Sequence, residues 1–201
     1  LCTSYTNNGR PPREKSSTLS GYPFPGSNHR MTEFQGAILA GQMRRLEQQT
    51  TLRSENAAHL DKLLEGIQGI SPAASYAGQT RHAYHLYMMQ YDMKHFSGLP
   101  RDKFVRAMHA EGIGKIYEGY NSPLNKQGFI EYRLNSRSYK SVFSKERLDK
   151  YRRENQCPEN DKICLETGLW LSQSVLLGTK KDMEDIAGAI VKIQRNSARL
   201  V

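Results

Sequence analysis

The sequence predicts an α/β or α+β fold, in which a long helix leads into a small sheet covered by helices. Three observations predict it. Apolar residues recur every three or four positions from residue 32 to residue 64, large side chains alternate from residue 83 to residue 91, and a second helical stripe begins near residue 179. Helical and strand patterns that follow one another favour packed layers over a helix bundle.

The chain begins with an irregular segment, residues 1–31, in which Ser, Gly and Pro are concentrated between residues 16 and 27. Thr32, followed three positions later by Gln35, is a capping-box pattern. It predicts that the long helix begins at this point.

The long helix is predicted to carry its apolar stripe to Leu64 and to end at Gly66 and Gly69, so that residues 32–68 form a connecting segment. Arg53 falls on the stripe, where an arginine usually reaches solvent or pairs with a carboxylate.

Residues 69–201 are predicted to form a small α/β domain with an irregular basic insertion near residues 131–155. The first strand carries large side chains on both faces, so we expect both faces to be covered. Pro100 and Gly112 bound a short helix, and Thr179 with Asp182 starts the last one. The predicted elements are strands at 83–91 and 113–117 and helices at 100–112, 160–170 and from 179 onward.

Composition excludes several classes of protein. With 201 residues and a mean hydropathy of −0.70, the chain has no apolar run long enough to cross a membrane and no apolar region typical of a signal peptide. Three cysteines suggest no disulfide framework, so a reducing cytoplasm is the expected compartment. No metal site is expected, because His82 and His85 would point to opposite faces of a strand and Cys157 and Cys164 form only one widely spaced pair.

The net charge of +9 raises the question of a nucleic-acid partner. Lys and Arg are interleaved with aromatic residues between residues 131 and 155. In some proteins such basic and aromatic side chains bind along the phosphate backbone of a nucleic acid. Acidic residues are scattered through the same segment, which favours a solvated insertion, and we expect neither nucleic acid nor membrane as a partner.

The start of the long helix is suited to an anion. A helix N-terminus exposes free amide groups and the positive end of the helix dipole. Asn28 adds a neutral donor and Arg30 a charged, fork-shaped one just before that point. A phosphate would fit these donors, although a turn-capping Asn28 and a solvated Arg30 explain the same residues.

The sequence pattern at the start of the long helix resembles that of a known protein family. Residues 26–39 read Gly-x-Asn-x-Arg-Met-Thr-Glu-Phe-Gln-x-Ala-Ile-Leu, and this pattern is similar to that of the DegT/DnrJ/EryC1/StrS family of pyridoxal 5'-phosphate (PLP)-dependent sugar aminotransferases. Further motifs follow in the same order and spacing, and the similarity extends over residues 20–193, least so at 131–155. These motifs are Tyr84-His85-Leu86-Tyr87, Glu111-Gly112-Ile113, Gly119-Tyr120, Pro123-Leu124, Leu176-Leu177-Gly178 and Asp182-Met183.

The resemblance implies the C-terminal portion of a fold type I PLP-dependent transferase that acts as a homodimer with shared active sites. The Schiff-base lysine would then precede residue 1, so no catalytic residue is assigned here and the fragment alone is expected to be inactive. The resemblance makes Asn28 and Arg30 cofactor-binding residues, with Asn28 reaching the phosphate across the dimer interface. Tyr120 and His85 become weaker candidates for substrate binding, each with a structural role as the alternative. Gly119 departs from the family, which often has His there.

The implied activity is transfer of an amino group from glutamate or glutamine to a keto-sugar or keto-cyclitol, often nucleotide-linked, for sugar, cell-surface polysaccharide or secondary-metabolite biosynthesis. Three alternatives stay open: a PLP-dependent sugar dehydratase of the same family, a non-catalytic regulator with this fold, and a basic nucleic-acid-binding module. The residues upstream of Leu1 would separate them.

Overall fold

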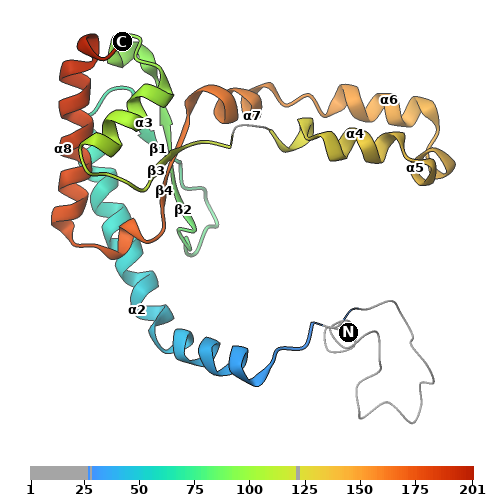
Figure 1. Ribbon diagram of the computed structural model, residues 1–201, viewed down its shortest axis with the longest axis horizontal. Helices are drawn as coiled ribbons and strands as arrows, with labels where there is room; N and C mark the ends of the chain where they lie inside the picture. The colour runs from blue at the N-terminus through green and yellow to red at the C-terminus, as the bar shows by residue number, and fades with distance from the viewer. Residues whose placement is uncertain (1–26, 28, 121–122) are drawn as a thin grey trace. The chain divides into compact units, whose positions relative to one another are not determined.

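The computed structural model describes residue 27, residues 29–120 and residues 123–201. It separates into two compact units, one up to Gln48 and one from Gln49 to Val201. The second unit contains a four-stranded antiparallel sheet with helices packed on one face (Figure 1). In the order in which they lie side by side, the strands are β1 (Ile70–Pro72), β2 (Leu86–Tyr91), β4 (Gly168–Ser172) and β3 (Ile116–Glu118).

The helices account for most of the described residues. They are α2 (Glu33–Leu64), α3 (Arg101–Ala110), α4 (Gly128–Asn135), α5 (Arg137–Val142), α6 (Lys145–Glu154), α7 (Pro158–Lys162) and α8 (Lys180–Asn196). A π-helical turn, Ile163–Thr167, joins α7 to β4. Among the described helices, none has the length and apolar character needed to span a membrane.

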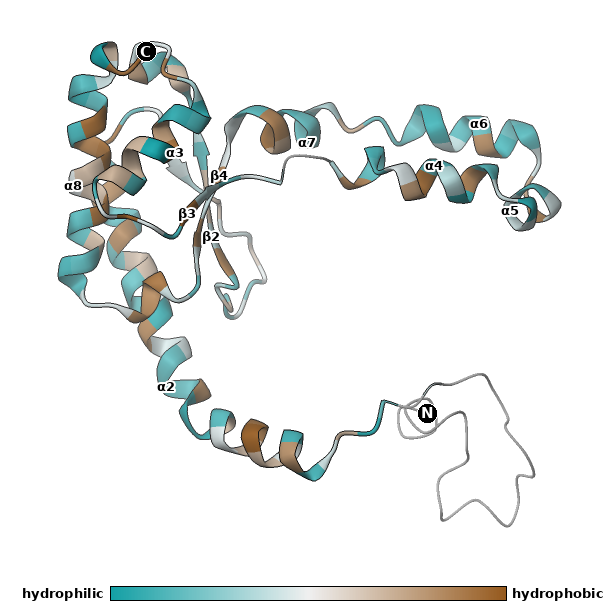
Figure 2. Cartoon of the chain, viewed as in Figure 1, coloured by the Kyte–Doolittle hydropathy of each residue, from teal (hydrophilic) through white to brown (hydrophobic). Residues whose placement is uncertain are grey.

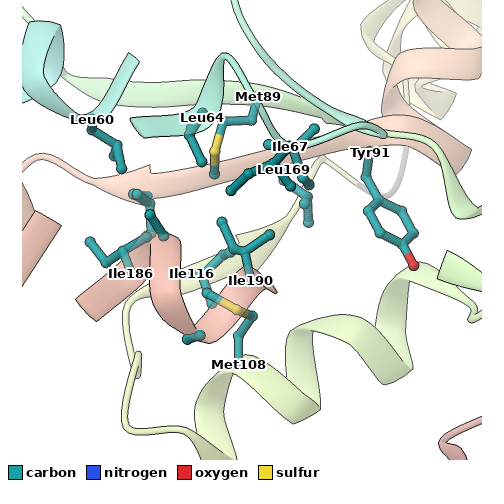
Figure 3. Close-up of a cluster of buried hydrophobic side chains, with 14 of the residues drawn as sticks. Leu60, Leu64, Ile67, Met89, Tyr91, Met108, Ile116, Leu169, Ile186 and Ile190 are labelled. Atoms are coloured by element: carbon teal, nitrogen blue, oxygen red, sulfur yellow. The ribbon is translucent and has the colours of Figure 1, made fainter. Parts of the chain in front are cut away.

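The core lies between one face of the sheet and three helices: the second half of α2, α3 and α8 (Figure 3). Alternate residues of each strand point into it, as the period of two in a strand requires. Met89 of β2, Ile116 of β3 and Leu169 of β4 meet Leu60 and its neighbours from α2 and α8. The predicted α/β layer architecture is therefore confirmed.

Asn56 joins α2 to the segment that precedes α8. Its side-chain amide is buried and donates to the carbonyl oxygens of Leu176 at 3.0 Å and Gly178 at 2.8 Å. Because a buried polar group needs a partner, these two bonds fix the register of α2 against this turn.

The last helix begins at the capping box that the sequence predicts. The hydroxyl of Thr179 accepts from the Asp182 amide at 3.3 Å, and the Asp182 carboxylate accepts from the Thr179 amide at 2.6 Å. The Thr179 amide, and then the Thr179 hydroxyl, lower the pKa of the Asp182 carboxyl by stabilising its charged form.

Asp182→Asn is therefore expected to lower stability at neutral pH and to flatten its dependence on pH. A carboxyl with a lowered pKa in the folded state contributes stability above its unfolded pKa of about 3.9, and this contribution is lost as pH falls through the folded pKa. Urea unfolding at a series of pH values between neutral and acid should show the two curves converging. Parallel curves would show that Asp182 is not the titrating cap.

Three sequence-based expectations are wrong in the small domain. The segment near residues 131–155 is helical, because Ser136 and Ser144 cap α5 and α6, and Arg152 binds Glu131 to hold α6 beside α4 (Figure 1). These helices are too short for a periodic stripe to reveal them.

The helix predicted at 160–170 stops early. After α7 and the π-helical turn, residues 168–172 form β4, a central strand that pairs with both β2 and β3. Leu169 and Leu171 are buried on one face of β4, and Trp170 lies on the other. This strand forms because β2 and β3, which lie far away in the sequence, pair with it on both sides.

The first predicted strand also differs. It begins at Leu86 and not at residue 83, because Tyr84 has a positive φ of 48°, which no strand accommodates. Only one of its faces is fully covered: Tyr87, Met89 and Tyr91 are buried, whereas Gln90 is exposed. The strand β1 was not predicted, and the strand expected at 113–117 runs from Ile116 to Glu118.

Candidate functional site

The N-terminal end of α2 is built as the sequence predicts. The Thr32 amide donates to Oε1 of Gln35 at 2.9 Å, and the Gln35 amide donates to the Thr32 hydroxyl at 3.3 Å. The first intrahelical bond runs from the Gly36 amide to the Thr32 carbonyl, so the amides of Glu33 and Phe34 have no carbonyl to bind within the helix. The N–H groups of these two amides point out of the N-terminal end of the helix.

Arg30 lies directly before this helix end and is exposed. It lines a shallow pocket of about 510 Å³ together with Gln35 and the apolar side chains of Met31, Ile38 and Leu39. Asn28, the other predicted donor, lies outside the described residues. The amides of Glu33 and Phe34, which bind no carbonyl within the helix, and the Arg30 guanidinium are donors of the kind that suit a phosphate group.

Apolar residues of this first unit are unusually exposed. Phe34 is 86% exposed, and Ile38 and Met43 are each 64% exposed. Figure 2 shows hydrophobic residues interspersed with hydrophilic ones along this half of α2. Leu39 and Leu46, each 47% exposed, lie on the same side of the helix as Met43, whereas Phe34 and Ile38 lie on another. Large apolar side chains exposed around a helix indicate a surface that contacts another protein surface.

His85 is exposed and lies just before β2. Aromatic rings contact one another around it: the Tyr84 ring is tilted by 39° against that of His82, with centroids 4.1 Å apart, and stacks on that of Tyr87 at 6.4 Å. The Tyr87 hydroxyl donates to Asp61 of α2 at 2.5 Å. Burial, followed by this bond to Asp61, raises the pKa of Tyr87, so the phenol stays protonated.

Tyr120 belongs to a cluster of three aromatic rings. Its ring is 61% exposed and stacks on Trp170 with a centroid separation of 5.8 Å and an interplanar angle of 16°. Tyr117 contacts the same indole at 5.1 Å. Sequence reasoning missed Trp170, although Leu169 and Leu171 alternate around it as in a short strand.

The segment that leads to Trp170 is held by Arg101. Its guanidinium donates to the carbonyl oxygens of Cys164 at 3.2 Å, Leu165 at 3.0 Å and Gly168 at 3.0 Å. Gly168 is required at this point, because a Cβ there would lie 2.6 Å from the carbonyl oxygen of Ile163. Arg101 thus connects α3 to the end of the π-helical turn.

The predicted site residues fall into separate groups. Arg30 lies in the first unit, whereas His85 and Tyr120 lie in the second. His85 is not part of the aromatic cluster: it precedes Leu86, whose register partner Ser172 lies two residues beyond Trp170. Arg53 is buried, and its Nε has no hydrogen-bond partner in the described part of the chain.

No group of three His, Cys, Asp or Glu side chains that could bind a metal ion occurs within residues 29–120 and 123–201. The described part of the chain thus offers two candidate binding features: hydrogen-bond donors for an anion at the start of α2, and an aromatic cluster on the sheet. The family model of the DegT/DnrJ/EryC1/StrS aminotransferases matches residues 1–191. The chain belongs to this family.

Curated aminotransferases are similar to this chain over most of its length. An L-glutamine:2-deoxy-scyllo-inosose aminotransferase from Streptoalloteichus tenebrarius is 33% identical over 175 residues, 87% of this chain and 40% of the relative. A protein of the same description from Streptomyces fradiae is 31% identical over 178 residues, again 87% of this chain and 40% of the relative. The chain therefore spans about 40% of the length of these relatives.

Solved structures of other proteins share the fold. The crystal structure of 3-amino-5-hydroxybenzoic acid synthase matches with a TM-score of 0.63 at 20% identity, over 95% of this chain and 45% of that one. A DegT DnrJ EryC1 StrS aminotransferase from Brucella abortus matches with a TM-score of 0.62 at 18% identity, over 94% of this chain and 42% of that one. The fold is thus that of one portion of such an aminotransferase.

Proposed function

We propose that this chain is the C-terminal part of a PLP-dependent aminotransferase that moves an amino group from glutamine to a keto-cyclitol. One observation carries the proposal: relatives named L-glutamine:2-deoxy-scyllo-inosose aminotransferase are 30–33% identical to it over 87% of its length. The sequence predicts glutamate or glutamine as the amino donor and a keto-sugar or keto-cyclitol as the acceptor. The names of these relatives favour glutamine and a keto-cyclitol.

The cofactor proposal is supported by the residues before α2. Arg30 and the amides of Glu33 and Phe34 form a donor set suited to the PLP phosphate, and Asn28 is proposed as a further donor. When bound, PLP supplies an electron sink, while the protein supplies position and proton transfer. The lysine that binds PLP covalently is proposed to lie in the portion of the relatives that this chain does not span.

The exposed apolar residues in the first half of α2 support the proposal of a homodimer with shared active sites. Phe34 and Ile38 share one side of the helix and follow the phosphate donors directly, so a surface covering them would lie beside the cofactor. His85 and Tyr120 are proposed to face the acceptor. The connecting role of residues 32–68 and a cytoplasmic location stay predictions.

A chimera tests the activity. This chain would replace the matching portion of the Streptoalloteichus tenebrarius relative, which is expected to restore glutamine-dependent amination of 2-deoxy-scyllo-inosose. Asn28→Ala in the chimera should weaken PLP retention by about 1.5–3 kcal/mol, the range for a hydrogen bond to a charged group. Gln48→Ala, an exposed position on α2, is the matched control.

The 201-residue chain alone should aminate nothing under the same conditions. A folded, dimeric chimera that retains PLP but transfers no amino group would contradict the proposal. Release of water from a sugar substrate in place of amino transfer would favour the dehydratase alternative. Specific nucleic-acid binding that persists at high salt would favour the binding module or regulator.

A further inference from the structure

The face of the sheet opposite the core carries a row of large side chains. Met88 of β2 and Tyr117 of β3 are both register partners of Trp170 on β4, so the three lie side by side across three strands. Their neighbours Leu169 and Leu171 are fully buried on the other face. Tyr120, just beyond β3, extends this row by stacking on Trp170.

Trp170 is fixed from two directions. Its indole N–H donates to the Glu118 carbonyl at 2.6 Å, so its polar edge is satisfied within the protein. The Gly119 amide donates to the Gly168 carbonyl at 2.8 Å, which ties the backbone just before Tyr120 to the start of β4. An indole held in this way can present only its ring face to a ligand.

Tyr120 is exposed but not randomly oriented, because its ring lies nearly parallel to that indole. Among the described residues its hydroxyl has no hydrogen-bond partner. Arg101, which lies beside Gly119, already donates to the carbonyls of Cys164, Leu165 and Gly168. The cluster therefore presents aromatic ring faces and one phenol hydroxyl to a ligand. The guanidinium of Arg101 is nearby, but its hydrogen bonds go to backbone carbonyls.

We propose that Trp170 is the positioning residue for Tyr120, and that the Tyr120 ring and hydroxyl contact an uncharged polyhydroxylated ring. This inference rests on the proposed function, in which Tyr120 faces the acceptor, and adds Trp170 as the residue that orients Tyr120. The C–H groups of a cyclitol carry partial positive charge and suit the negative face of an aromatic ring, while its hydroxyl groups pair with the phenol. A few polar groups among aromatic side chains are typical of small-molecule sites.

The chain contains one tryptophan, so its emission reports on this cluster alone. Titration of the 201-residue chain with 2-deoxy-scyllo-inosose should change the emission saturably, whereas inorganic phosphate should not. Tyr120→Phe should weaken the apparent affinity about fivefold, the change expected for loss of one hydrogen bond. Tyr132→Phe, at a similarly exposed tyrosine on α4, is the matched control and should leave the affinity unchanged.

A double-mutant cycle tests the positioning role, with binding followed by calorimetry because the tryptophan is replaced. If Trp170 acts through Tyr120, Trp170→Leu should weaken binding, and adding Tyr120→Phe to it should weaken binding little further. Trp170→Phe keeps a ring and should recover part of the affinity. Urea unfolding of each variant confirms that it is folded.

Additive effects of the two substitutions would overturn the positioning role. No saturable emission change, the result expected if another protein surface covers the cluster, would overturn the ligand site. An active chimera combined with a failed titration contradicts only this inference. Saturable binding combined with a folded but inactive chimera contradicts only the amino-transfer proposal.

Discussion

Leu171→Ala is expected to destabilise the second unit by about 3–5 kcal/mol, the upper part of the range for a large-to-small change in a core. Leu171 is fully buried on β4, where its register partners are Tyr87 of β2 and Ile116 of β3. The cavity would therefore open at the middle of the sheet, between two neighbouring strands. Urea unfolding followed by far-UV circular dichroism measures the loss.

Leu165→Ala provides the control for Leu171→Ala. It removes the same atoms from the π-helical turn three residues before β4, where Leu165 is 51% exposed. Its cost should stay well below that of Leu171→Ala, because less apolar surface leaves water there on folding. Equal losses in the two variants would contradict the central position of β4 in the sheet.

Arg101→Met is expected to cost about 2–3 kcal/mol, because it removes the charge-assisted hydrogen bonds to the end of the π-helical turn. Methionine keeps much of the apolar stem, so the change isolates the guanidinium. The carbonyls of Cys164, Leu165 and Gly168 would lose their donor. Amide hydrogen exchange should accelerate mainly across residues 158–168, which this guanidinium holds against α3.

Arg106→Met is the matched control on the same helix, because Arg106 is exposed and forms a surface ion pair with Asp102 one turn away. Such a surface pair contributes about 0–1 kcal/mol. Exchange that is unchanged in Arg101→Met, or accelerated equally in both variants, would show that Arg101 does not hold the turn.

The elements that the sequence predicts well are those whose signals are local. The capping boxes at Thr32 and Thr179 each lie within four residues, and both are present. The apolar stripe of α2 likewise predicts its end at Leu64, because residues three and four apart share a helix face. The family resemblance also came from local motifs, and the family match confirms it.

Other features depend on partners that lie far away in the sequence. Residues 168–172 become a strand because β2 and β3 supply hydrogen bonds on both sides, and no window of the sequence around Trp170 contains those partners. The helices α4 and α6 are held together by Arg152 and Glu131, which are 21 residues apart. Their amphipathic patterns are too short to appear as a period.

The candidate site divides in the same way. By itself, the sequence determined the helix N-terminus with Arg30 before it, because capping and the helix dipole are properties of consecutive residues. It also pointed to Tyr120. Only the tertiary structure decided that Tyr120 stacks on Trp170, 50 residues later, because that contact exists once β3 and β4 pair. Strand pairing joins residues across sequence distances that no local pattern records.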